Sequence, residues 1–337
     1  MAELSGPLGR RQFLGMAAVG LGAASVGLLT ACGKDAQADA AGQTSAGPAI
    51  RAAGSPSGSS GVMRQALRLA AEELGTAQVE IADMAQGTAL LSMRKGSVTC
   101  AMMSWVNFAQ AKDQGAECVA IAPAWASHAS IMVPAGSDIK TLDDLRGVRM
   151  GSAERTTGVY QETRAVLSEN GLDIEKDIHL TPMGDSTVML ALYKKGEFEA
   201  VLDNEPMTSQ MLADGSSREI LQIGRHQAEQ NNGRFTPVNS WGVRKDWLEK
   251  QDQQKIHELF LHATELAKTS KKPYEAAAEQ IGLDAKATEL FRKRFSKLVV
   301  PEFTDQNLED AQKMLDQSRS LGMVEEKFAV TDFVFKA

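Results

Sequence analysis

From about residue 49 onward, short apolar runs alternate with longer stretches in which apolar residues recur at helical spacing. Runs of about four to eight apolar residues between turn residues are typical of buried strands. Apolar positions three and four apart are typical of amphipathic helices, as for Val62, Ala66, Leu69, Ala70 and Leu74. The predicted strands are 48–53, 79–82, 98–103, 118–122, 148–151, 178–181, 200–203, 219–223 and 239–243.

Helical stretches separate these strands, and nearly everything after Asp246 has a helical pattern. Strands that alternate with helices at this spacing favour parallel sheets covered on both faces. The alternation pauses at 129–134 and restarts with a short helix over 141–147, where Thr141 and Asp144 have the spacing of a capping box. The predicted helices between strands are 62–74, 88–94, 105–111, 158–170, 186–195 and 207–212.

The interruption of the alternation at 129–134 and the last strand, 239–243, which looks like a return to the first group of strands, predict an α/β protein of two lobes. We expect the first lobe to comprise 49–130 and 238–337, and the second lobe to comprise 131–237. The candidate crossover segments between them are 127–138 and 224–242. Because small molecules bind at the carboxyl ends of parallel strands, we expect a ligand cleft between the two lobes.

The first 31 residues have the pattern of an export signal. Arg10 and Arg11 are followed by an uncharged run, 15–31, and then by Cys32. This run of about 17 residues is at the short limit for a membrane span, so a retained span is the alternative interpretation. Residues 33–48 are rich in Ala, Gly, Ser and Asp without apolar periodicity, which predicts a flexible tether.

Composition narrows the class of protein further. The chain is 43% hydrophobic and 23% charged, as a globular protein is, and its net charge of −7 argues against a nucleic-acid partner. Cys100 and Cys118 could pair, but two buried thiols are the favoured interpretation. Of the five histidines, only His257 and His262 are close in sequence, so we expect no metal, no cofactor and no catalytic residue.

Four stretches carry a resemblance to a known family. Residues 141–151 resemble its T-x-x-D-L-K/R-G segment, and residues 196–206 resemble its G-x-I/V-D-A … E-P segment. Residues 87–96 are similar to its first-lobe G-x-x-x-x-x-A-L-x-x-G segment, and residues 54–57 lie where its first binding loop would fall. In order and spacing, from residue 49 to about 330, the chain resembles ABC-transporter solute-binding proteins of the nitrate/sulfonate/taurine and thiamine-precursor type.

Two shorter features accompany this resemblance. Arg10 and Arg11 before Phe-Leu resemble a twin-arginine export signal, and Leu29 to Cys32 resembles a bacterial lipobox. Glu199-Ala200 replaces the family's Asp-Ala pair, a departure that concerns a turn. The resemblance implies a type II periplasmic-binding fold and a monomeric, exported protein that is anchored to the membrane by a lipid on Cys32.

The function implied is capture of a small organic solute, anionic or heterocyclic, for delivery to an ABC permease. Two alternatives stay open. A pyrimidine-synthesising enzyme shares this fold, but it would need a histidine and a cofactor-binding lysine in the cleft, and the predicted loops have no such pair. The second alternative is a sensor that signals ligand occupancy to a partner protein. The sequence does not distinguish such a sensor from a transport subunit.

Polar and aromatic residues near the predicted strand ends are the candidate ligand contacts. Several of them also have an interpretation without a ligand. The loop 54–60 could be a simple capped turn, and Trp105 could be a core residue. Arg155 could be a solvated surface arginine, and Glu205 could be part of a helix start. As a ligand contact, Arg155 is expected to pair with an anionic group. The predicted contacts are Ser55, Pro56, Ser57, Gln86, Thr88, Ser104, Trp105, Arg155, Thr156, Thr157, Asn204, Glu205 and Trp241.

Overall fold

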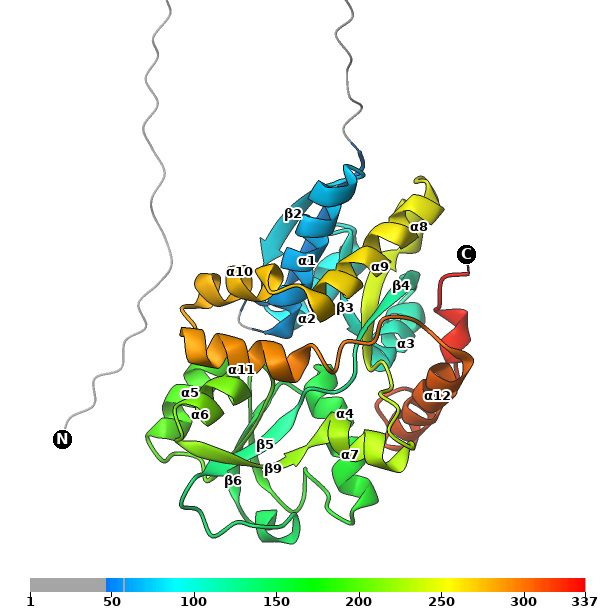
Figure 1. Cartoon of the computed structure of the whole chain (residues 1–337). Helices are drawn as coiled ribbons and strands as arrows, with labels where there is room; N and C mark the ends of the chain where they lie inside the picture. Colours follow the sequence, from blue (N-terminus) through cyan, green and yellow to red (C-terminus); the bar gives the residue numbers. More distant parts are fainter. Residues whose placement is uncertain (1–46, 57, 337) are drawn as a thin grey trace, which may run out of the picture. The chain divides into compact units, whose positions relative to one another are not determined.

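The structure, a computed structural model, describes residues 47–56 and 58–336 (Figure 1). The predicted export signal, the predicted lipidation site Cys32, most of the predicted tether and Ser57 lie outside the described residues. The described part contains two five-stranded sheets with helices packed against them, which gives the two predicted α/β lobes.

The first sheet has the strand order β2-β1-β3-β10-β4. β1 runs parallel to β2 and β3, whereas β10 runs antiparallel to both β3 and β4. β10, which was predicted only as a return strand, enters from the second lobe and is antiparallel to its two neighbours. The strands are β1 (Ala49–Gly54), β2 (Gln78–Asp83), β3 (Cys100–Ser104), β4 (Cys118–Trp125) and β10 (Asn239–Arg244).

The second sheet has the order β7-β6-β8-β5-β9, with β5 antiparallel to β8 and β9. The segment interpreted as a pause is the strand β5, which the chain forms directly after it crosses from the first sheet. The predicted helix over 141–147 is only a 3₁₀ turn, Asp143–Leu145. The strands are β5 (Ser130–Pro134), β6 (Arg149–Ala153), β7 (His179–Met183), β8 (Ala200–Asp203) and β9 (Ser217–Gln222).

Helices pack on both sheets and also join them. α1, α9 and α10 pack together over the first sheet, and α11 contacts both α10 and α6 of the second lobe (Figure 1). α12 contacts α3 and α4, so it also touches both lobes. The helices are α1 (Ser59–Leu74), α2 (Gln86–Lys95), α3 (Trp105–Asp113), α4 (Gly158–Glu169), α5 (Ser186–Lys194), α6 (Met207–Ala213), α7 (Ile223–Gln230), α8 (Lys245–Leu248), α9 (Gln253–Thr269), α10 (Lys272–Ile281), α11 (Ala285–Phe295) and α12 (Asp305–Ser320).

The buried stripe of α1 is wider than its predicted one. Val62, with Ala66 and Ala70, is fully buried, as predicted, but Leu74 is 45% exposed and Met63 and Leu67 are buried in addition. The reason is that α1 packs against α9 and α10 as well as the sheet. Apolar contacts on three sides cover more of the helix than one 3.6-residue stripe.

Trp241 lies in the core of the first lobe, which corrects its prediction as a ligand contact. Its side chain is 0% exposed, and its indole N–H donates to Thr264 Oγ1 at 3.1 Å. Its ring packs edge-on against Phe260, with ring centroids 5.1 Å apart. Trp241 belongs to β10, which follows a crossover, but its side chain packs against α9 and leaves no surface for a ligand.

This placement predicts that Trp241 contributes to stability and not to ligand affinity. Trp241→Phe removes ring volume and one buried hydrogen bond, so it should lower the free energy of unfolding by about 1–3 kcal/mol. Urea unfolding measures this loss, and calorimetric titration of the folded variant should give an unchanged ligand dissociation constant. A large loss of affinity at unchanged stability would contradict the core assignment.

Candidate functional site

The two lobes meet at the carboxyl ends of several of their parallel strands. Ser59 Oγ donates to the carbonyl oxygen of Glu205 at 2.9 Å, and Ser104 Oγ donates to Gln161 Oε1 at 3.0 Å. Asn107 Nδ2 donates to the carbonyl oxygen of Thr156 at 3.3 Å. We call this region the interlobe seam: residues 54–56, 58–64, 83–88 and 104–107 of the first lobe, and residues 154–162 and 203–206 of the second lobe.

Helix starts position two of the seam segments. Ser104 caps α3 and forms a capping box with Asn107. Thr157 caps α4, accepting from the Tyr160 backbone N–H at 3.3 Å. Gly158 then lets α4 approach the first lobe, because a Cβ there would lie 2.9 Å from both Asn239 Nδ2 and Glu162 Oε1. The seam therefore brings several backbone N–H groups of helix starts toward one region.

The predicted contacts of the first-lobe loops lie at or beside the seam, with different exposures. Ser55 and Pro56 are half-buried, and Ser60 Oγ donates to the Ser55 carbonyl oxygen at 2.8 Å. Gln86 begins α2, and its amide donates to the carbonyl oxygen of Met102 at 2.7 Å, so it ties α2 to β3. Thr88 is exposed on the same helix.

For Trp105 the structure favours the core alternative. The indole N–H donates to the Pro237 carbonyl oxygen at 2.7 Å, and the ring packs against Phe108 and Phe303. The cavity beside it, which Ser104 and Glu162 also line, has a volume of about 20 Å³. That volume holds about one water molecule and not a planar ligand.

The prediction that Arg155 pairs with an anionic group of the ligand stays a prediction, and in this structure Arg155 pairs with Glu175. Arg155 Nε and Nη2 donate to the two carboxylate oxygens of Glu175 at 2.6 and 2.7 Å. The Tyr160 hydroxyl donates to the same carboxylate. The Arg155 hydrogen bond lowers the pKa of Glu175, so this pair stays ionised. Thr156 is exposed and offers its carbonyl oxygen to Asn107.

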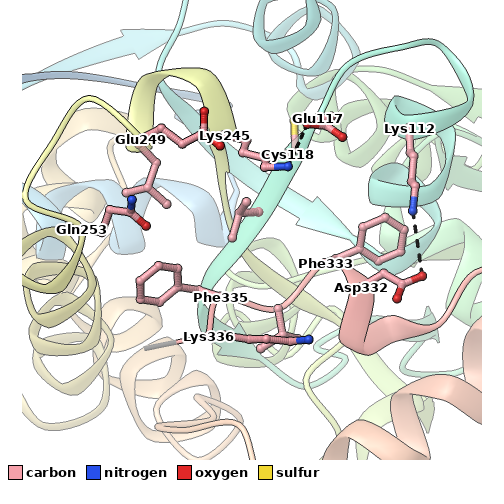
Figure 2. Close-up of a pocket in the computed structure, with 13 residues that line it drawn as sticks. Lys112, Glu117, Cys118, Lys245, Glu249, Gln253, Asp332, Phe333, Phe335 and Lys336 are labelled. Atoms are coloured by element: carbon pink, nitrogen blue, oxygen red, sulfur yellow. Dashed lines mark hydrogen bonds and ion pairs between the residues drawn. The ribbon is translucent and has the colours of Figure 1, made fainter.

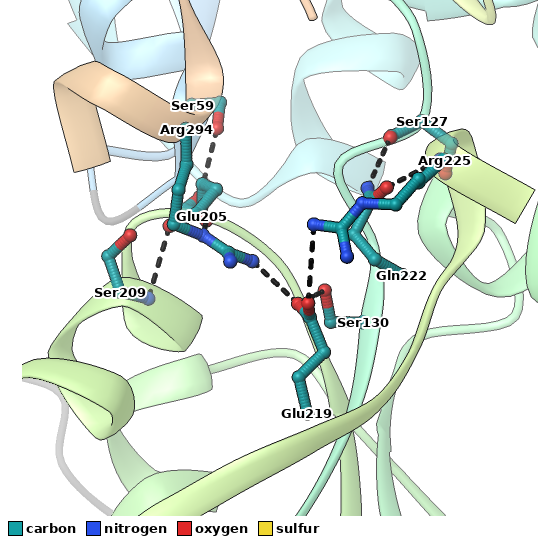
Figure 3. A network of polar contacts seen from close by, with 9 residues as sticks. All are labelled: Ser59, Ser127, Ser130, Glu205, Ser209, Glu219, Gln222, Arg225 and Arg294. Atoms are coloured by element: carbon teal, nitrogen blue, oxygen red, sulfur yellow. Dashed lines mark hydrogen bonds and ion pairs between the residues drawn. The ribbon is translucent and has the colours of Figure 1, made fainter. Parts of the chain in front are cut away.

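Glu205, another predicted ligand contact, is buried and bonded to other residues of the protein. It is 1% exposed, its Oε1 accepts from Arg294 Nε at 2.6 Å, and its Oε2 accepts from the Ser209 N–H at 3.1 Å. Arg294 Nη2 donates to Glu219 Oε1 at 2.6 Å, and Ser130 Oγ donates to the same oxygen at 2.7 Å (Figure 3). We call Arg294, Glu205 and Glu219 the Arg294 clamp.

The clamp joins α11 to the second lobe. Burial raises the pKa of Glu205, and the guanidinium of Arg294 opposes this by favouring the charged carboxylate. Asn204, the neighbouring predicted contact, donates its backbone N–H to Asp203 Oδ1 at 2.8 Å and has a half-buried side chain. Asn204 is therefore the more accessible of these two predicted contacts.

Sequence reasoning missed three buried charged residues at the seam, each with a polar atom that has no partner among the described residues. They are Arg64 (Nη2, 1% exposed), Asp203 (Oδ2, 1% exposed) and Glu162 (Oε1, 7% exposed). Burial raises the pKa of Asp203 to about 7 and that of Glu162 to about 8. Buried polar atoms without partners are rare and mark places where a ligand or water completes the hydrogen bonding. An arginine inside the buried stripe of α1 was the signal available in the sequence.

A larger cavity, of about 380 Å³, lies away from the seam. It is lined by the start of β4, by α8 and by the C-terminal residues, including Lys112, Lys245 and Phe335 (Figure 2). None of the predicted contacts lines it. Lys245 pairs with Glu117 at 3.0 Å and Lys112 with Asp332 at 3.9 Å, so four of the six charged residues that line it form ion pairs.

Cys100 and Cys118 are free, buried thiols, as favoured from the sequence. Burial raises their pKa to about 12 and about 11, so neither is a thiolate nucleophile at neutral pH. His257 faces the carbonyl oxygen of Ile121 at 2.7 Å, and His262 contacts Glu73 at 2.8 Å. Within residues 47–56 and 58–336, no helix is both long enough and apolar enough to span a bilayer.

Solved structures share this fold. The alkanesulfonate-binding protein SsuA from Xanthomonas axonopodis pv. citri, bound to MOPS, is 18% identical with a TM-score of 0.69, over 86% of this chain and 98% of that chain. The periplasmic aliphatic sulphonate-binding protein SsuA from Escherichia coli is 17% identical with a TM-score of 0.66, over 85% and 97%. A mutant of DszB in complex with biphenyl-2-sulfinic acid is 12% identical with a TM-score of 0.58, over 85% and 96%.

These likenesses confirm the predicted fold class, two α/β lobes of the periplasmic-binding type. A search of curated protein sequences gave no match. The family model of the periplasmic substrate-binding protein of phosphonate ABC transporters matches residues 67–284. Since this match covers more than half of the chain, the protein belongs to that family of ABC-transporter substrate-binding proteins.

Proposed function

We propose that this substrate-binding protein holds a small organic solute, anionic or heterocyclic, at the interlobe seam and hands it to an ABC permease as a monomer. The observation that carries this proposal is the set of buried charged residues at the seam with unpartnered atoms, Arg64, Asp203 and Glu162. A bound solute supplies the missing partners. A buried polar atom without a hydrogen-bond partner costs free energy, so these three side chains favour the solute-bound, closed state.

Helix starts add a second element of recognition. The N-termini of α3 and α4, capped by Ser104 and Thr157, both lie at the seam. Helix N-termini favour anionic groups because unpaired backbone N–H groups and the helix dipole point toward them. The two related proteins named for sulfonate binding are consistent with an acidic group on the solute.

Closure of the lobes provides the mechanism. A solute that bridges the two halves binds the closed state more tightly than the open state, so its binding shifts the population toward closure. The hydrogen bonds from Ser59, Ser104 and Asn107 across the seam form only when the lobes are together. We favour a receptor over an enzyme of the same fold because the chain belongs to a family of ABC-transporter substrate-binding proteins.

A thermal-shift screen tests the proposed function. Sulfonates, phosphonates, pyrimidines and aromatic acids are compared with inorganic sulfate and phosphate as controls. At least one organic compound should raise the melting temperature strongly, because a ligand at about 100 times its Kd adds about 2.7 kcal/mol of stability. Calorimetric titration should then give one site per chain. If no compound stabilises the protein, or if one is chemically converted, the receptor function is wrong.

Lipid anchoring is a separate prediction, which rests on the residues before the described part. Cys32→Ala removes the thiol that the lipobox resemblance assigns to lipidation. The variant should move from the membrane fraction to the released fraction, as judged by immunoblotting. Thr30→Ala, which leaves the cysteine in place, is the matched control. An unchanged distribution of Cys32→Ala would refute anchoring at this residue.

The raised pKa of Glu162 predicts a specific dependence of stability on pH. In the folded protein its pKa is about 8, against an ordinary value of 4.5, because burial disfavours the charge. The stabilising effect of the protonated carboxyl is therefore complete below the ordinary value and is lost as pH rises through about 8.

Glu162→Gln, which is neutral at every pH, isolates this effect. The free energy of unfolding of the native protein relative to that of the variant should fall by about 1.4 kcal/mol per pH unit across this window. Urea unfolding at a series of pH values measures it. A pH-independent difference between the two proteins would show that Glu162 is not buried in the folded state.

A further inference from the structure

A cavity of about 290 Å³ lies beside the Arg294 clamp. Among the described residues, its walls come from α11 and the turn after it, from the start of α7 and from Phe235, which lies between α7 and β10. Glu205 also lines it and is the only one of these described lining residues that belongs to the seam. The cavity is therefore distinct from the place where we propose that the solute binds.

One face of α11 gives the cavity a wall with both apolar and basic side chains. Lys293, Arg294 and Lys297 lie three, four and seven residues after Leu290, which places all four on one side of the helix and of the turn that follows it. Lys293 and Lys297 are exposed, whereas Arg294 is half-buried and held by the clamp. The two lysine side chains can therefore turn toward a bound ligand.

The cavity carries more positive than negative charge. Its lining includes four cationic side chains, whereas Glu205 is the one carboxylate among the described residues that line it. The whole chain has a net charge of −7, so this local excess is opposite in sign to the charge of the protein. A concave surface that concentrates one sign of charge attracts ligands of the opposite sign. The cationic residues are Arg225, Lys293, Arg294 and Lys297.

The carboxylates of the clamp are already engaged by two arginines. Glu205 pairs with Arg294 at 2.6 Å, and Glu219 is shared between Arg294 at 2.6 Å and Arg225 at 3.7 Å (Figure 3). The contact of Arg225 is the longer one, and its side chain is 62% exposed. The guanidinium of Arg225 therefore keeps N–H donors for an additional anion.

The two lysines are matched by negative charge even less completely. Lys293 contacts Glu289 at 3.4 Å, but the same carboxylate accepts two hydrogen bonds from Arg292, both at 2.9 Å. Lys297 forms no ion pair within residues 47–56 and 58–336. An anion bound in the cavity would supply the negative charge that these side chains lack.

Apolar surface completes the cavity and indicates what kind of anion fits it. Phe235 and Leu290 are half-buried and Leu298 is buried, and all three line the same space. Its volume of about 290 Å³ is close to the lower end of small-molecule sites, about 300–1,000 Å³. An inorganic ion would leave the apolar walls uncovered. A carboxylate, phosphonate or sulfonate on an aromatic or short aliphatic body would contact both kinds of side chain.

We propose that this cavity is a second binding site, for a small organic anion whose acidic group pairs with Lys297 and Arg225 and whose apolar body packs against Phe235 and Leu298. The site is separate from the solute site at the seam, and its existence does not depend on the proposed function. Because its walls come from α11 and from the segment between α7 and β10, a bound anion adds contacts between these two parts of the chain.

Titration with 4-bromobenzoate tests the proposal, with acetate as the anion that lacks an apolar body. The native protein should bind 4-bromobenzoate at least about tenfold more tightly than acetate in calorimetry, because the ring buries apolar surface. In a crystal soaked with the probe, the anomalous signal of bromine should lie between Phe235 and Leu298. No binding at millimolar concentration, or bromine found only at the seam, would overturn the proposal.

Variants assign the binding to the cavity. Lys297→Gln and Arg225→Gln should each weaken 4-bromobenzoate about tenfold, the loss expected for a hydrogen bond between charged groups. Lys195→Gln removes an exposed lysine outside the cavity, and Asn204→Ala changes the seam, so both should leave the affinity unchanged. Melting temperatures of the free variants report folding. Unchanged affinities in the two cavity variants, or an equal loss in Lys195→Gln, would refute the site.

Discussion

The Arg294 clamp is the interaction on which the geometry of the seam depends. One guanidinium from α11 holds two carboxylates of the second lobe, Glu205 and Glu219, and both contacts measure 2.6 Å. Breaking one partner of a buried ion pair typically destabilises a protein by about 3–5 kcal/mol, because the remaining charge is left without compensation. The clamp therefore fixes α11 against α6, and it sets where the first loop meets the second lobe.

Much of the architecture was predictable because it depends on local patterns. The alternation of apolar runs and helical stretches located nine of the ten strands of the described residues, all except β5. Strand direction was harder to predict, since β5 and β10 each run antiparallel within a sheet of otherwise parallel strands. Each follows a crossing between lobes, and a crossing reverses the direction of the chain in a way that periodicity does not record.

The site was less predictable, because the partner of a polar side chain is set by tertiary structure. Arg155 pairs with Glu175, 20 residues away, and Glu205 pairs with Arg294, 89 residues away. Both Arg155 and Glu205, which the sequence predicted as ligand contacts, therefore form ion pairs within the protein. Arg64 and Asp203 instead carry the unmet hydrogen bonds, and only the buried environment of the folded chain distinguishes them from ordinary charged residues.

The distance between the two lobes should change if they close around a solute, and it can be measured with spin labels. Spin labels on cysteines placed at exposed Leu91 and Val188, in a Cys32→Ala background, span α2 and α5. Cys100 and Cys118 are buried with raised pKa values, so they should not take the label. We expect a saturating solute from the screen to shorten the distance between the labels and to narrow its distribution. An identical distribution with and without bound solute would contradict it.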